Sequence, residues 1–106
     1  MDIRGMMKQA QAMQAKMQAA QAELETAEVE GAAGGGMVRV TATAKGQVKN
    51  VSIDDSLMKP EEKEILEDLL LAALEDARKK AERVAEEKMK SVTAGLPLPP
   101  GMKLPF

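Results

Sequence analysis

The sequence predicts an α+β protein in which two long helices flank a small antiparallel sheet. Three observations support this fold class. Apolar residues recur at alternating three-residue and four-residue steps over the first 27 residues, apolar and polar residues alternate around residue 40, and a second helical stretch follows Pro60. We expect a single domain over residues 1–94 and a proline-rich tail over residues 95–106.

The first helix is expected from about Asp2 to about Ala27, where the good helix formers Ala, Gln, Met, Lys and Glu dominate. Its apolar positions have the spacing of a coiled-coil seam. These positions are Ile3, Met6, Ala10, Met13, Met17, Ala20, Leu24 and Ala27. Such a seam is shielded from water only when another helix lies along it, so this segment predicts helix-on-helix packing.

The glycine-rich segment 31–36 ends the helical pattern and predicts a turn, because glycine readily takes a positive φ. Residues 37–44 then alternate as in a half-buried strand. One face carries Val38, Val40 and Ala42, and the other carries Arg39, Thr41 and Thr43. A turn at 45–47 and a further strand at 48–53 follow. A short strand near residues 28–31 would complete an antiparallel sheet.

The second helix is expected from Pro60 to Val92 or Thr93, because proline suits the first helical position and Gly95 supplies a stop. At about 1.5 Å per residue this helix is close to 50 Å long, so its far end must project from a domain of this size. Its apolar stripe is broadest near its start, which suits packing on the sheet and on a second chain. The predicted dimer interface is Leu66, Leu69, Leu70, Ala73 and Ala77.

The composition excludes several classes of function. The chain has no Cys and no His, which removes disulfides, thiolate and imidazole metal sites, and the usual general base near neutral pH. An enzyme would have to rely on carboxylates and lysines, and it ranks behind the binding functions considered below. We expect no enzyme activity, cofactor, metal or small-molecule substrate. No apolar run approaches the roughly 20 residues of a membrane span, and residues 1–8 lack the pattern of an export signal. A cytoplasmic protein that is not bound to a membrane is expected.

The net charge of −2 and the pI of about 5.2 give no reason to expect nucleic acid, but the charges are unevenly distributed. The first part of the second helix is acidic, whereas its far part and the start of the first helix are basic. The basic residues are Arg4, Lys8, Lys16, Arg78, Lys79, Lys80, Arg83, Lys88 and Lys90. They either bind phosphates or simply complement the negative carboxyl end of a helix and keep its surface hydrated.

If these residues bind nucleic acid, duplex DNA is favoured over single strands, because the only aromatic residue is Phe106 and unstacked bases would lack a platform. No recognition-helix module is visible either, so contacts with the phosphate backbone are expected rather than base-specific reading. The lack of aromatic core fillers also favours an oligomer, because a lone domain of this size buries a limited fraction of its surface.

Several segments together resemble the bacterial YbaB/EbfC nucleoid-associated family. They are residues 8–11 with Met13 and Met17, the glycine cluster before residues 38–40, residues 53–54 with 56–57, residues 67–69, residues 76–77 and the ending at residues 98–103. The resemblance covers almost the whole chain. It implies an α-β-β-β-α protomer and a tweezer-like homodimer that binds double-stranded DNA with little sequence demand.

The same resemblance implies roles in nucleoid organisation, gene regulation and DNA protection, and a location in the nucleoid. Carried over by position, the DNA contacts would come from the nine basic residues named above. The competing hypothesis is a protein-binding or chaperone-like helical clamp that uses the Met-rich first helix, including Met13 and Met17. Charge reversal on the second helix and polar substitution of these methionines would separate the two hypotheses.

Overall fold

A computed structural model of the chain describes residues 2–93 and confirms the α+β class and the predicted order of elements. Helix α1 (Ile3–Thr26) is followed by strands β1 (Glu28–Ala33), β2 (Val38–Thr43) and β3 (Val48–Ile53) and by helix α2 (Lys63–Thr93). Two short 3-10 turns, Asp55–Leu57 and Pro60–Glu62, connect β3 to α2. The predicted tail at 95–106 lies outside the described residues.

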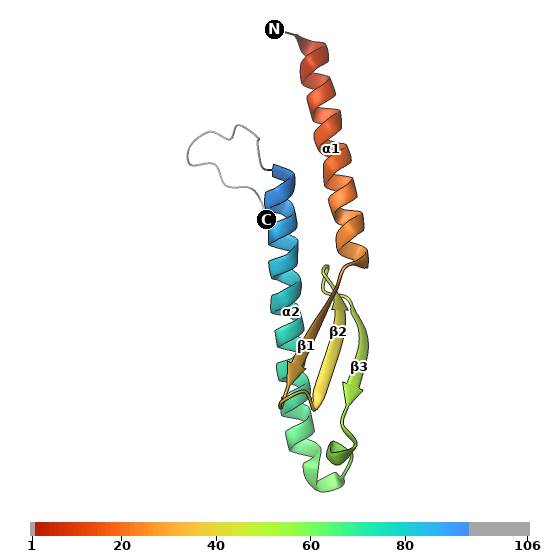
Figure 1. Ribbon diagram of the computed structural model, residues 1–106, viewed down its shortest axis with the longest axis vertical. Coiled ribbons are helices and arrows are strands. Elements are labelled where there is room, and N and C mark those ends of the chain that lie inside the picture. Colours follow the sequence, from red (N-terminus) through yellow and green to blue (C-terminus); the bar gives the residue numbers. More distant parts are fainter. Residues whose placement is uncertain (1, 94–106) are drawn as a thin grey trace.

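The molecule is elongated, with principal extents of 71 × 27 × 15 Å and a radius of gyration of 19.7 Å. A compact domain of this length would have a radius of gyration of about 13 Å. Figure 1 shows α2 running past the sheet and then alongside the lower part of α1, whose amino-terminal half extends further still. The projection predicted for the end of α2 is therefore present, and α1 forms the longer arm.

No helix among residues 2–93 is both long and apolar enough to cross a membrane.

The three strands form an antiparallel sheet in the order β1-β2-β3. The hairpin between β1 and β2 turns at Gly34, Gly35 and Gly36, which all have positive φ. The predicted turn at 31–36 was too long at its start, because β1 continues to Ala33. Gly31 belongs to the strand for a packing reason: a Cβ atom there would lie 2.3 Å from the Ala73 carbonyl oxygen, so α2 passes directly over β1.

The core lies between α2 and the inner face of β1 and β2. Its buried members are Val38, Val40, Ala42, Leu57, Ala73 and Ala77. The predicted alternation holds along β2 as far as Ala42, and the pairing with β3 is irregular between Thr41 and Ala42, where Lys49 of β3 has no partner. Thr43, expected on the outer face, is only 1% exposed.

Strand β3 lies beside the core, not beneath α2, which packs mainly against β1 and β2. Val51 pairs with Val40 and so shares the face that α2 covers elsewhere, yet it is 42% exposed. Val48 is 47% exposed. Within residues 2–93, the outer strand thus leaves a strip of apolar surface exposed and has one strand edge without a partner strand.

The predicted seam of α1 is covered over part of its length. Ala20 and Leu24 are buried where α1 packs against α2, whereas Ile3 and Met6 are 68% and 57% exposed. The Asp2 side chain caps the helix by accepting a hydrogen bond from the Arg4 backbone N–H at 3.1 Å. Helix α1 is therefore anchored at its carboxyl end and free of contact with α2 at its amino end.

Candidate nucleic-acid interface

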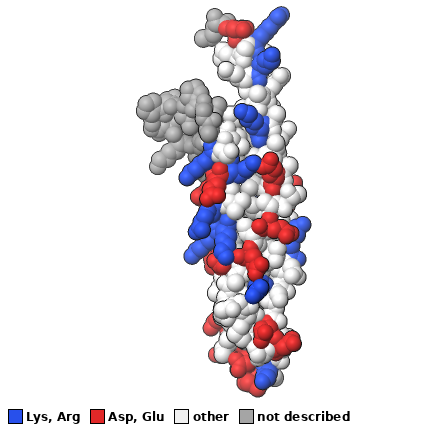
Figure 2. Space-filling view, in the orientation of Figure 1, with Lys and Arg blue, Asp and Glu red and all other residues white. Residues whose placement is uncertain are grey.

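The nine basic residues predicted from the sequence lie on both helices, towards the end of the molecule where α1 projects. Figure 2 shows Lys and Arg side chains along α1 and over the edge formed by α2, whereas Asp and Glu dominate the opposite, sheet-side end. Eight of the nine are exposed, and Lys88 is half-buried. Their surroundings divide them into cations that are free and cations that are already paired.

The free cations of α2 are Lys79, Arg83 and Lys90. They are exposed and form no ion pair with any residue between 2 and 93. Their spacing of four and then seven residues places them on one stripe of the helix. Glu86 falls on the same stripe between Arg83 and Lys90 and reduces its positive charge.

The cations of α1 are Arg4, Lys8 and Lys16, and they too are exposed and unpaired within residues 2–93. Arg4 and Lys8 are four residues apart and share a face of the helix. No acidic residue occurs between Asp2 and Glu23. The projecting arm of the molecule is therefore basic along its length, although the whole chain is acidic.

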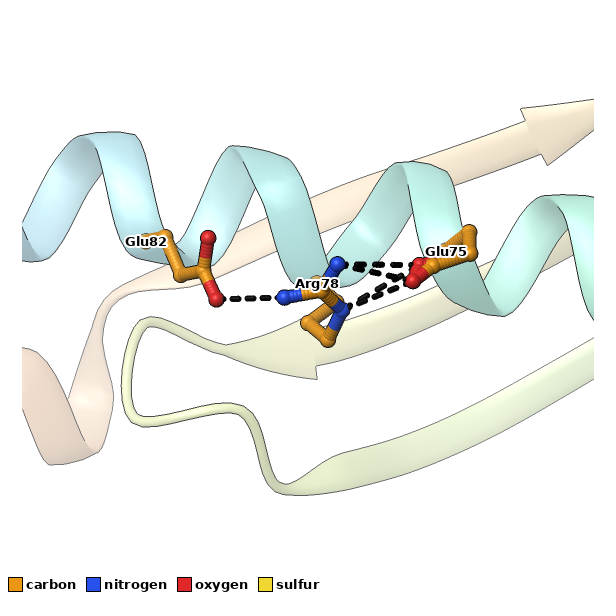
Figure 3. Close-up of polar contacts among 3 residues, drawn as sticks. All are labelled: Glu75, Arg78 and Glu82. Carbon is orange, nitrogen blue, oxygen red and sulfur yellow. Dashed lines mark hydrogen bonds and ion pairs between the residues drawn. The ribbon is translucent and has the colours of Figure 1, made fainter.

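Arg78 is held between two carboxylates of its own helix (Figure 3). Its Nη2 atom lies 2.8 Å from Glu75 Oε1, and its Nη1 atom lies 2.5 Å from Glu82 Oε1. The hydrogen bonds that Arg78 donates to Glu75 lower the pKa of that carboxyl group and raise the pKa of the guanidinium. We call these three residues the Arg78 clamp.

Lys80 is used to attach α2 to the edge of the sheet. Its ammonium donates to the Glu30 carbonyl oxygen at 2.9 Å and pairs with Asp76 Oδ2 at 3.0 Å. Asp76 Oδ2 in turn accepts a hydrogen bond from the Ala32 backbone N–H at 3.0 Å. The Ala32 N–H and, secondarily, Lys80 lower the pKa of Asp76. Two polar groups on the open edge of β1 are thereby satisfied by side chains of α2.

Lys88 forms an ion pair with Glu23 and so links α2 to α1. Three of the nine predicted cations, Arg78, Lys80 and Lys88, are therefore already engaged within the protomer.

The predicted dimer interface is partly covered within the protomer. Ala73 and Ala77 are 0% and 2% exposed because β1 and β2 already cover them, so these two alanines have no surface to offer a second chain. Leu66, Leu69 and Leu70 are half-buried, and their assignment stays a prediction.

The acidic partners of these cations were missed as site residues in the reading of the sequence. Glu75 and Glu82 stand three residues before and four residues after Arg78, and Asp76 stands four residues before Lys80. Side chains three or four residues apart on a helix are neighbours, so these ion pairs could have been predicted from the sequence. The contacts with Glu23 and with the Glu30 carbonyl depend on packing between elements. Among residues 2–93, no group of three or more potential metal-ligating side chains comes together.

Comparison with known proteins places this arrangement in context. The model of the YbaB/EbfC DNA-binding family matches residues 1–96. A nucleoid-associated protein of Methylocella silvestris is 70% identical over 105 residues, covering 99% of this chain and 98% of that protein. A second nucleoid-associated protein, from Agrobacterium fabrum, is 55% identical over 105 residues, covering 99% of this chain and 98% of that protein. The crystal structure of an uncharacterized protein from Helicobacter pylori superimposes with a TM-score of 0.74 at 26% identity, covering 86% of this chain and 96% of that one.

Proposed function

Because the chain belongs to the YbaB/EbfC DNA-binding family, we propose that it is a nucleoid-associated protein that binds double-stranded DNA through phosphate contacts, with little sequence preference. The observation that carries this proposal is the presence on the projecting helices of two groups of exposed cations that form no ion pair within residues 2–93. Lys79, Arg83 and Lys90 form the stripe on α2. Arg4 and Lys8 form the stripe on α1, and Lys16 lies further along the same helix.

The dimensions of these stripes suit a duplex. From Lys79 to Lys90 the helix rises about 16 Å, which corresponds to about five base pairs along a DNA axis. Lysines and arginines on a helix surface contact backbone phosphates without reading base edges, so weak sequence preference follows. Association of this kind releases counterions and is therefore strongly salt-dependent.

The proposal includes a homodimer, which doubles the number of cationic stripes and lets one molecule bridge or bend a duplex. Support comes from strand β3, where Val48 and Val51 are uncovered beside an unpaired edge. Such an edge is a ready site for pairing with another strand. Binding in the nucleoid would then contribute to nucleoid organisation, gene regulation and protection of DNA.

The experiment that tests DNA binding compares two charge reversals of equal size. Lys79→Glu with Arg83→Glu alters the free stripe on α2, whereas Lys59→Glu with Lys63→Glu alters exposed lysines at the opposite end of the molecule. Binding to several unrelated duplexes of about 30 base pairs is measured across a salt series. If a dimer neutralises about 4 to 8 phosphates, log affinity falls against log salt with a slope of about −4 to −7.

We expect the first variant to lose at least about tenfold in affinity on every duplex, since four phosphate contacts of a dimer are replaced by repulsion. The second variant should bind like the native protein. Absence of binding by the folded native protein at low salt would refute the proposed function. Equal losses in both variants would refute the assignment to the α2 stripe.

A second function is favoured by one observation: Ile3, Met6 and Met7 are 68%, 57% and 58% exposed at the free end of α1. Exposed methionines adapt to varied apolar partners, as a chaperone-like helical clamp requires. Replacement of Met6 and Met13 by Gln should abolish suppression of aggregation of an unfolded client if this function is correct. The same change should leave DNA affinity within about twofold if phosphate contacts dominate.

A further inference from the structure

We propose that Glu75 and Glu82 hold Arg78 away from DNA and thereby weaken binding along one flank of α2. The Arg78 clamp is thus an attenuator of affinity. This inference rests on the DNA-binding function proposed above, and it concerns how strongly the same surface binds. Three features of the clamp support it, namely its contacts, its net charge and its exposure.

The contacts occupy most of the donors of the guanidinium. Arg78 Nε donates to both carboxylate oxygens of Glu75 at 2.9 and 3.2 Å, and Nη2 donates to Glu75 Oε2 at 3.1 Å. Nη1 donates to Glu82 Oε1 at 2.5 Å from the other side. Bidentate recognition of a phosphate uses these same donors. A phosphate must therefore displace at least one carboxylate before Arg78 can bind it.

The net charge of the clamp is −1, because two carboxylates surround one guanidinium. A phosphate approaching this flank meets repulsion where an isolated arginine would attract it. The adjacent stripe differs, since Lys79 and Arg83 have no carboxylate within ion-pair distance among residues 2–93. The clamp and the adjacent stripe therefore differ in charge, and the border between them lies where Lys79 neighbours Glu75.

The exposure of the clamp argues against a role in folding. The side chains of Arg78, Glu75 and Glu82 are 54%, 45% and 59% exposed, and ion pairs this open to solvent contribute little to stability. Removal of the acids should accordingly leave the fold intact. It would also raise the local charge by two and free the guanidinium for a phosphate.

The test is a set of matched variants in the duplex-binding assay. Glu75→Gln with Glu82→Gln frees Arg78, while Glu67→Gln with Asp68→Asn makes the same change in net charge at exposed positions near the start of α2. We expect the first pair to bind about fivefold more tightly, with a salt slope more negative by about one for each freed arginine that reaches a phosphate. The control pair should change affinity less than about twofold.

Substitution of Arg78 itself tests whether the freed guanidinium causes the gain in affinity. Arg78→Gln alone leaves Glu75 and Glu82 without their cation and should not raise affinity. Arg78→Gln added to the Glu75→Gln, Glu82→Gln variant should remove most of its gain. Glu82→Gln alone, which keeps the Glu75 contact, should give a smaller gain and provides a second variant if the double variant unfolds. Thermal melting monitored by circular dichroism establishes that each variant is folded.

The outcomes separate the two proposals. A native protein that binds no DNA at low salt overturns the proposed function and this inference together. A native protein that binds DNA, combined with a Glu75→Gln, Glu82→Gln variant no tighter than its control, overturns the attenuation alone. A triple Arg78→Gln, Glu75→Gln, Glu82→Gln variant that keeps the full gain also overturns it, because the freed guanidinium would then contribute nothing to binding.

Discussion

At the scale of single residues, Gly31 determines how closely α2 can lie on the sheet. A Cβ atom at this position would lie 2.3 Å from the Ala73 carbonyl oxygen and 2.4 Å from the Ala77 backbone nitrogen. Both obstacles are backbone atoms, which cannot move aside as a flexible side chain could. The glycine is needed here for close approach of two backbones and not for a turn.

We predict that Gly31→Ala destabilises the protein by about 3 kcal/mol, because α2 must separate from β1 and lose contacts with the core. Urea unfolding monitored by circular dichroism measures this loss. Gly5→Ala makes the same chemical change in α1, where an added Cβ meets only the side chain of Asp2 at 3.3 Å. That control should be neutral or stabilised by up to about 1 kcal/mol. An equal effect of the two substitutions would contradict the close-approach explanation.

At the scale of elements, the contact of Asp76 with β1 and with Lys80 connects a helix to the edge of a sheet. The Ala32 N–H and Lys80 favour the ionised carboxylate, so the pKa of Asp76 in the folded protein lies below its ordinary value of 3.8. A carboxyl group with a lowered pKa stabilises the fold fully above its unfolded-state pKa. This stabilisation is lost as the pH falls through the lowered value.

We therefore predict that Asp76→Asn lowers the urea midpoint of unfolding at pH 7 and that the difference from the native protein shrinks as the pH falls below 3.8. Asn keeps an acceptor for the Ala32 N–H but carries no charge for Lys80. Asp68→Asn, at an exposed position of the same helix, is the matched control and should show no such pH-dependent difference. A difference between Asp76→Asn and the native protein that stays constant down to pH 2 would count against this role.

At the scale of the whole molecule, the exposed strip on β3 is the observation that supports the proposed homodimer. Val48 and Val51 face the side of the sheet that α2 shields over β1 and β2, but α2 does not reach them. A second chain placed against this strip would bury the valines and pair the free edge. It would also add the second pair of cationic arms that bridging of DNA requires.

If the proposed homodimer forms through β3, Val51→Asp should yield a monomer of 11.4 kDa, because a charge would be buried in an apolar interface. Sedimentation equilibrium measures the mass. Ser52→Asp adds the same charge on the opposite face of β3 and should leave the dimer intact, because Ser52 pairs with the outward-facing Arg39. Dimers in both variants would place the interface elsewhere, and a monomeric native protein would refute the homodimer.

Much of the fold could be predicted from the sequence because it is locally encoded. The seam spacing of α1, the alternation along β2, the glycines at 34–36 and Pro60 each act within a few residues of their own position, and the elements begin and end close to the predicted bounds. The basic character of the arms was also readable. So was the Arg78 clamp, since its partners lie three and four residues away on one helix.

The amino-acid sequence by itself thus determined the order and type of the elements and the acidic and basic halves of α2. Tertiary structure decided the contacts that engage cations across elements. Lys80 is taken by a carbonyl group 50 residues away in β1, and Lys88 by Glu23 of α1. It also decided that Gly31 lies against α2 and that β3 stays uncovered. The physical reason is that periodicity defines the faces of a helix or strand, whereas the packing of elements determines what lies against each face.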